Sequence, residues 1–118
     1  MKPSILVVDD DPAMVRTLCD IFTLQGWDVG AAYSGEEAIE KQRERPHGFV
    51  LMDIRMPGID GIEAYKAIHR QSPSTRVILM TAHATPEAVQ HAIDEGVWRV
   101  MPKPIDLPSL FRMLAPAA

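Results

Sequence analysis

Five short apolar runs recur along this chain at intervals of about twenty residues, with a helical pattern after each one. The runs cover residues 4–8, 27–33, 49–52, 76–80 and 97–101. Apolar runs of this length, bounded by turn signals, are typical of strands buried on both faces. Strands that alternate with helices predict an α/β fold, in which helices cover both faces of a parallel sheet. Right-handed crossovers then allow the strand order 2-1-3-4-5.

Capping signals mark where the intervening helices begin. The first helix is expected to run from Pro12 to a stop at Gly26, and the last from residue 107 to about 114. The fourth helix is expected to carry Ala88, Val89, Ala92 and Ile93 and to end at Gly96. The predicted caps, in chain order, are Asp11, Ser34 (with Glu37), Asp60 (with Glu63), Thr85 and Asp106.

Length and composition predict one globular domain over residues 1–118, because 47% of the residues are hydrophobic and 24% are charged. A net charge of −4 argues against direct binding of nucleic acid. Cys19 is the single cysteine, which fits a reducing compartment and excludes a disulfide within the chain. No signal peptide or membrane span is recognisable, so a cytoplasmic location is expected. The closing residues 115–118 read either as a tail or as a cut into a longer chain.

The stretch from residue 47 to 61 places one aspartate, Asp53, at the end of a buried strand, directly before a turn. Other strand ends carry polar residues too: Asp9 and Asp10 follow the first strand, Thr81 the fourth and Lys103 the fifth. All strands of a parallel sheet end at one edge, where such sheets bind ligands. The three aspartates are therefore predicted to meet between the first and third strands.

Three carboxylates that lie within a few ångströms repel one another and call for a cation. Oxygen ligands in a small cluster suit Mg²⁺. One Mg²⁺ and the Lys103 ammonium would balance the three carboxylates, which leaves a neutral site able to receive a phosphoryl group. An aspartate can accept that group, while Thr81 and Lys103 hold its oxygens. Read singly, the residues fit helix caps, a strand-end hydroxyl and a solvated lysine, but together those readings require unrelated coincidences at four strand ends.

The chain resembles the receiver domain of two-component response regulators, a flavodoxin-like, doubly wound fold. Four motifs carry the resemblance: ILVVDDDP at 5–12, LMDIRMPGIDG at 51–61, VILMTAHA at 77–84 and MPKPID at 101–106. It implies that Asp53 is the phosphoacceptor, and that Asp10, Asp9 (through water) and the backbone carbonyl of Arg55 help to bind Mg²⁺. It also implies that Thr81 and Lys103 hold the phosphoryl group, and that the Lys103–Pro104 peptide is cis.

The resemblance further implies a switch rather than an enzyme with turnover on a separate substrate. A histidine kinase or phosphotransfer protein would supply phosphate, and an output domain or target protein would bind the face formed by helix four, strand five and helix five. Homodimerisation is left open. One alternative is an aspartyl phosphohydrolase, but Arg55 occupies the place of its general acid. Another is a constitutive interaction module that has lost phosphorylation.

Two features depart from the family pattern. Val100 stands where receivers usually carry a switch aromatic three residues before the lysine, which bears on the mode of output. Arg55 and His83, each two positions beyond an active residue, are bulky and bear on phosphoryl lifetime. Because side chains alternate along a strand, Trp98 is expected to share the face of Val100 and to serve the output surface, with Trp27 at the opposite edge.

Overall fold

The computed structural model describes residues 2–115, and in this range strands and helices alternate throughout. The strands are β1 (Ser4–Val8), β2 (Asp28–Ala32), β3 (Phe49–Asp53), β4 (Arg76–Thr81) and β5 (Arg99–Pro102). The helices are α1 (Pro12–Leu24), α2 (Gly35–Glu44), α3 (Gly61–Gln71), α4 (Pro86–Asp94) and α5 (Leu107–Leu114). No helix within these residues has the length and apolar content needed to cross a bilayer.

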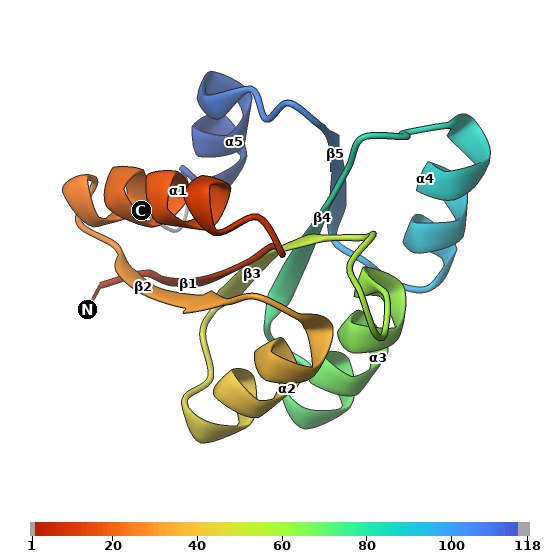
Figure 1. Ribbon diagram of the computed structural model, residues 1–118, viewed down its shortest axis with the longest axis horizontal. Coiled ribbons are helices and arrows are strands. Elements are labelled where there is room, and N and C mark those ends of the chain that lie inside the picture. The colour runs from red at the N-terminus through yellow and green to blue at the C-terminus, as the bar shows by residue number, and fades with distance from the viewer. Residues whose placement is uncertain (1, 116–118) are drawn as a thin grey trace.

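All five strands pair in parallel in the order β2-β1-β3-β4-β5, which confirms the predicted fold (Figure 1). The sheet has β3 at its centre, and every residue of β3 is buried. Helices α1 and α5 cover one face, and α2, α3 and α4 cover the other (Figure 1). The carboxyl ends of β1, β3, β4 and β5 therefore share one edge, as the sequence predicted.

Each helix begins at the capping residue that the sequence predicts. The side chain of each cap accepts a hydrogen bond from the backbone of the first turn, which satisfies amide groups that have no partner within the helix. Asp11 accepts from Ala13 and Met14, and four further caps do the same: Ser34 from Glu37, Asp60 from Glu63, Thr85 from Ala88 and Asp106 from Ser109.

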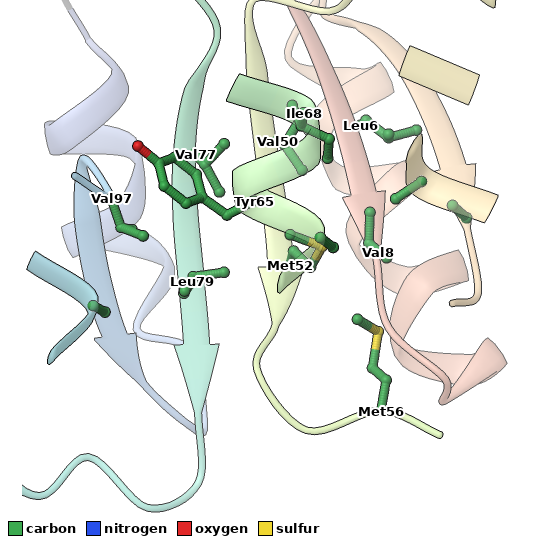
Figure 2. Packing of buried hydrophobic residues seen from close by; sticks show 14 residues of the cluster. Leu6, Val8, Val50, Met52, Met56, Tyr65, Ile68, Val77, Leu79 and Val97 are labelled. Atoms are coloured by element: carbon green, nitrogen blue, oxygen red, sulfur yellow. The ribbon is translucent and has the colours of Figure 1, made fainter. Parts of the chain in front are cut away.

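Alternate side chains of the strands feed two separate cores. Leu6, Val50 and Leu79 point toward α2, α3 and α4, as part of the cluster drawn in Figure 2. Neighbouring residues such as Val7 and Leu51 point the other way, toward α1 and α5. Of the apolar residues on α4, Ala92 is buried, whereas Ile93 is 43% exposed. Helix α4 packs on the edge of the sheet with a narrow stripe, which leaves Ile93 outside it.

Trp98 does not share a face with Val100, so that expectation was wrong. The alternation rule applies only within a strand, and β5 begins at Arg99 because the Val97 amide still closes the end of α4 by donating to the Ala92 carbonyl. Val100 packs in the α2–α4 layer, whereas Trp98 packs in the α1–α5 layer.

Trp27 lies toward the opposite edge of the sheet, as expected, but it shares a neighbour with Trp98. The ring centroid of each tryptophan lies 5.7 Å from the ring centroid of Phe49 on β3. The three rings therefore form one aromatic row with Phe49 in the middle. A change in the environment of one tryptophan can therefore reach the other through Phe49.

A buried polar network closes the opposite, amino-terminal end of the sheet. The His47 amide and its ring Nδ1 both lie on the side-chain oxygen of Gln42, at 2.8 and 3.0 Å. The Gln42 side-chain nitrogen donates to the His47 carbonyl and to the Thr75 hydroxyl. Because an amide oxygen only accepts, the ring hydrogen of His47 lies on Nδ1.

The other ring nitrogen of His47, Nε2, is buried and has no hydrogen-bond partner among the described residues. It faces Gly30 of β2, where a Cβ would stand 2.7 Å from it. Burial lowers the pKa of His47, and the positive charges of Arg45 and Lys41 lower it further. The native fold therefore favours the neutral imidazole.

Candidate functional site

The ends of β1 and β3 bring three carboxylates together. Asp9, Asp10 and Asp53 each offer an oxygen, and these oxygens all lie within 4.8 Å of one another. Asp9 is 1% exposed and Asp53 is 7% exposed, whereas Asp10 faces solvent. The cluster thus combines two buried carboxylates with one that opens outward.

Lys103, from the end of β5, supplies the positive charge that this cluster needs. Its ammonium donates to Asp9 Oδ2 at 2.7 Å and to Asp53 Oδ2 at 3.0 Å. Burial alone would lower the pKa of Lys103, but the hydrogen bonds and charges of both aspartates outweigh it and raise the pKa. Lys103 is therefore a protonated bridge between the first and third strands.

Asp10 carries the excess negative charge of the site. Partial desolvation, the adjacent Asp9 side chain and the charge of Asp53 all raise the pKa of Asp10. A carboxylate so placed gains from a nearby cation, because the cation removes the repulsion. Oxygen donors in this number and spacing fit Mg²⁺, which binds through one or two carboxylates and keeps several waters.

Asp9 and Asp53 are held in place by the backbone around them. Asp9 Oδ1 accepts from the Asp11 amide at 3.0 Å, so Asp9 also braces the turn into α1. Asp53 Oδ1 accepts from the Arg55 amide at 3.2 Å. Arg55 thus has its backbone beside the Asp53 carboxylate, and its side chain is exposed.

The chain can pass this close to Asp53 because residue 61 is glycine. A Cβ at Gly61 would stand 2.6 Å from the Asp53 carbonyl oxygen and 2.9 Å from Ile54 Cα. The Gly61 amide donates to the Ile54 carbonyl at 2.7 Å, which closes the loop between β3 and α3. A larger residue at position 61 would push α3 away from the end of β3.

Thr81 ends β4, one residue beyond Met80, which pairs with Asp53, and is 4% exposed. Its hydroxyl oxygen accepts from the His83 amide at 3.0 Å, so its own proton remains free to donate. Its carbonyl accepts from the Lys103 amide at 2.8 Å, which ties the ends of β4 and β5 together. The Lys103–Pro104 peptide is cis, as predicted.

Sequence reasoning missed a cavity that opens next to this cluster. It has a volume of about 680 Å³ and lies between α1 and the turn that follows β5. Met14 and Ile21 of α1, with Ile105 from the turn and Leu107 of α5, give it apolar walls, while Lys103 lies at one end. The periodicity of the sequence does not reveal such a cavity, because it does not tell a core stripe from a groove wall.

The chain matches a protein-family model and is similar to known regulatory proteins. A family model described as the response regulator receiver domain matches residues 5–115. Regulatory protein AtoC of Escherichia coli (strain K12) is 41% identical over 106 residues, which cover 90% of this chain and 23% of AtoC. Transcriptional regulatory protein ZraR of Salmonella typhimurium is 35% identical over 116 residues, which cover 98% of this chain and 26% of ZraR. The chain spans about a quarter of the length of these curated relatives.

Solved structures share the whole fold. A CheY-like response regulator receiver domain protein from Methanospirillum hungatei JF-1 superimposes with a TM-score of 0.92 at 25% identity, covering 99% of this chain and 94% of that one. A chain of the CheX–CheY–BeF3–Mg complex from Borrelia burgdorferi gives a TM-score of 0.88 at 30% identity, covering 98% of this chain and 90% of that one.

Proposed function

Because the chain belongs to the response regulator receiver domain family, we propose that Asp53 accepts a phosphoryl group and that the domain acts as a phosphorylation-controlled switch. The observation that carries this proposal is the Lys103 ammonium, which joins Asp9 and Asp53 within a cluster of three carboxylates. An ion pair that only stabilises the fold would need one carboxylate beside Lys103. The two additional carboxylates supply the negative charge that a bound cation would balance.

The residues that would hold Mg²⁺ are Asp9, Asp10, Asp53 and the backbone carbonyl of Arg55. Their oxygen donors and spacing support this choice of metal. When bound, Mg²⁺ would add positive charge beside the transferred phosphoryl oxygens. The printed composition of the Borrelia burgdorferi complex, with BeF3 and Mg, describes that relative and agrees with the proposal.

In the proposed reaction a carboxylate oxygen of Asp53 attacks the phosphorus of a phosphohistidine on a histidine kinase or phosphotransfer protein. The P–N bond breaks, the imidazole leaves with the bonding electrons and takes up a proton, and an acyl phosphate forms on Asp53. Lys103 would move its hydrogen bond from Asp53 to a phosphoryl oxygen. The free hydroxyl proton of Thr81 would be donated to another oxygen.

The domain would act as a switch and not as an enzyme with turnover. Arg55, an exposed guanidinium, offers no acid–base group beside Asp53 for rapid release of phosphate. Movement of Thr81 toward the phosphoryl group would alter the face formed by α4, β5 and α5, where Val100 replaces the usual aromatic. An output domain or target protein would bind there, and homodimerisation through this face is the alternative.

Residues 1–118 would form one receiver unit, acting in the cytoplasm as part of a longer regulator. The curated relatives are about four times as long as this chain, which supports a further output domain. Direct contact with nucleic acid would fall to such a domain, because the receiver carries a net charge of −4.

Mass spectrometry of the intact protein with acetyl phosphate and Mg²⁺ tests this function. The parent should gain one phosphoryl group, and that group should be labile to hydroxylamine, as an acyl phosphate requires. Asp53→Asn should gain none. Equal labelling of Asp53→Asn, or labelling that persists in EDTA, would contradict the proposal.

A further inference from the structure

The loop that links β3 to α3 is anchored at its base, close to Asp53. The Ile54 amide donates to the Met80 carbonyl at 2.9 Å, and the Gly61 amide donates to the Ile54 carbonyl at 2.7 Å. Residues 55–60 project from this base. Under the proposed function this loop has to present the Arg55 carbonyl to a metal ion, so its tip needs support.

That support comes from the first turn of α2, the helix that packs beside α3. The Ile59 amide donates to Glu36 Oε2 at 3.3 Å. Gly58 rests on the same carboxylate, since a Cβ at this position would stand 2.5 Å from Oε2 and 2.9 Å from Oε1. Gly58 also has a φ of +86°, a conformation that favours glycine.

A second contact, made by different atoms, presses the same two segments together. A Cβ at Gly35 would stand 2.8 Å from Ile59 Cγ1 and 3.2 Å from the Ile59 carbonyl oxygen. The Ile59 side chain packs against the core between the sheet and α2–α4. The loop tip is therefore held between the buried core and the start of α2.

Electrostatics favour a carboxylate at this position. Glu36 lies in the first turn of α2, where the exposed amide groups of the helix create a partial positive charge. Its neighbour Glu37 has a different task, because it accepts from the Tyr33 amide before the helix. The two glutamates of this turn thus serve separate segments: Glu37 serves the helix cap, and Glu36 serves the β3–α3 loop.

We propose that Glu36 is a positioning residue for the phosphoacceptor site. By accepting the Ile59 amide and supporting Gly58, it holds the loop tip and thereby keeps the backbone of Arg55 beside Asp53. Glu36 lies outside the cluster of three carboxylates and would touch neither the metal nor the phosphoryl group. The inference rests on the proposed function, because it gives the loop the task of supplying the Arg55 carbonyl to Mg²⁺.

Isothermal titration with Mg²⁺ tests this role with three variants. Glu36→Ala removes the acceptor and should weaken Mg²⁺ binding about two- to fivefold, the low end of what one lost hydrogen bond causes. Glu36→Gln keeps an acceptor oxygen for the Ile59 amide and should bind Mg²⁺ within about twofold of the parent. Glu40→Ala removes one charge from the same helix, at an exposed residue that pairs with Arg43, and should bind like the parent.

The variants separate positioning from long-range attraction. If Glu36→Ala binds Mg²⁺ as tightly as the parent, the positioning role is refuted. If Glu36→Gln is weakened as much as Glu36→Ala, the carboxylate acts by its charge alone, and the role is also refuted. A parent protein that binds no Mg²⁺ would overturn the proposed function itself, a result distinct from both.

Discussion

Replacement of Lys103 by methionine should show how strongly the site depends on this partly buried cation. Lys103→Met keeps most of the side-chain volume but removes the ammonium that lies 2.7 Å from Asp9 and 3.0 Å from Asp53. The side chains of these aspartates are 1% and 10% exposed, so water cannot replace the lost charge well. Two buried carboxylates would be left facing each other, with Asp10 beside them.

The burial of these side chains sets the expected loss in the free energy of unfolding. Removing one partner of a buried ion pair costs about 3–5 kcal/mol. The Lys103 side chain is 21% exposed, which argues for the lower end, about 3 kcal/mol. For a domain of this size, such a loss lowers the melting temperature by roughly 10 °C. Since the native pKa of Lys103 is raised, its stabilising effect is complete at neutral pH and disappears only as the pH rises through that pKa.

Thermal unfolding followed by circular dichroism, in EDTA at neutral pH, measures this effect. Lys66→Met is the matched control, because Lys66 also contacts two carboxylates, Glu63 and Glu95, but at the surface. Exposed pairs contribute less than about 1 kcal/mol, so the control should melt within a few degrees of the parent. A Lys103→Met variant that melts with the parent would refute the picture of a charge-balanced buried cluster.

Three further variants test other parts of the same structure. Asp10→Asn should raise the melting temperature in EDTA and remove most of the stabilisation that Mg²⁺ gives the parent, because it relieves the like-charge crowding; a less stable variant that still gains fully from Mg²⁺ would contradict this. Because the native pKa of His47 lies below its usual 6.5, the unfolded chain binds a proton that the native ring refuses, so stability should fall as the pH drops below about 6.5. Urea unfolding at several pH values should show that the free energy of unfolding falls less steeply with decreasing pH for His47→Gln than for the parent. If the two proteins lose stability in parallel, the His47 imidazole is not the cause of the pH dependence. The double variant of Arg55→Ala and His83→Ala should change the decay rate of phospho-Asp53 without preventing its formation, because these exposed side chains follow Asp53 and Thr81 by two residues and would shield the phosphoryl group from water; unaltered decay would show that they do not shield it.

Local signals in the sequence were enough to predict much of this fold. A cap such as Asp11 acts on amides two or three residues away, so the sequence alone contains both partners. The strand order also followed, because right-handed crossovers and helices on both faces leave few arrangements. Trp98 shows the limit of such reasoning. The alternation of side chains predicts which face a residue occupies only when the first residue of the strand is known. Here the hydrogen bond from the Val97 amide to the end of α4 places the start of β5 at Arg99, after Trp98.

The site was predictable as a set of residues but not as a geometry. Asp9, Asp53 and Lys103 were expected on one edge, since each ends a parallel strand. Their hydrogen bonds join residues 94 and 50 positions apart, and only the packed sheet brings them together. Glu36 carried no sequence signal beyond the capping pattern around it, because its partner, the Ile59 amide, is 23 residues away in a loop.

The central claim, that Asp53 and no other aspartate accepts phosphate, is tested most directly by locating the acyl phosphate in the chain. Sodium borohydride reduces an aspartyl phosphate to homoserine, which tandem mass spectrometry of peptides assigns to one position. After treatment with acetyl phosphate and Mg²⁺, homoserine should be found at position 53, with Asp9 and Asp10 unchanged. Homoserine at position 9 or 10, or a labelled protein with aspartate intact at position 53, would contradict the account.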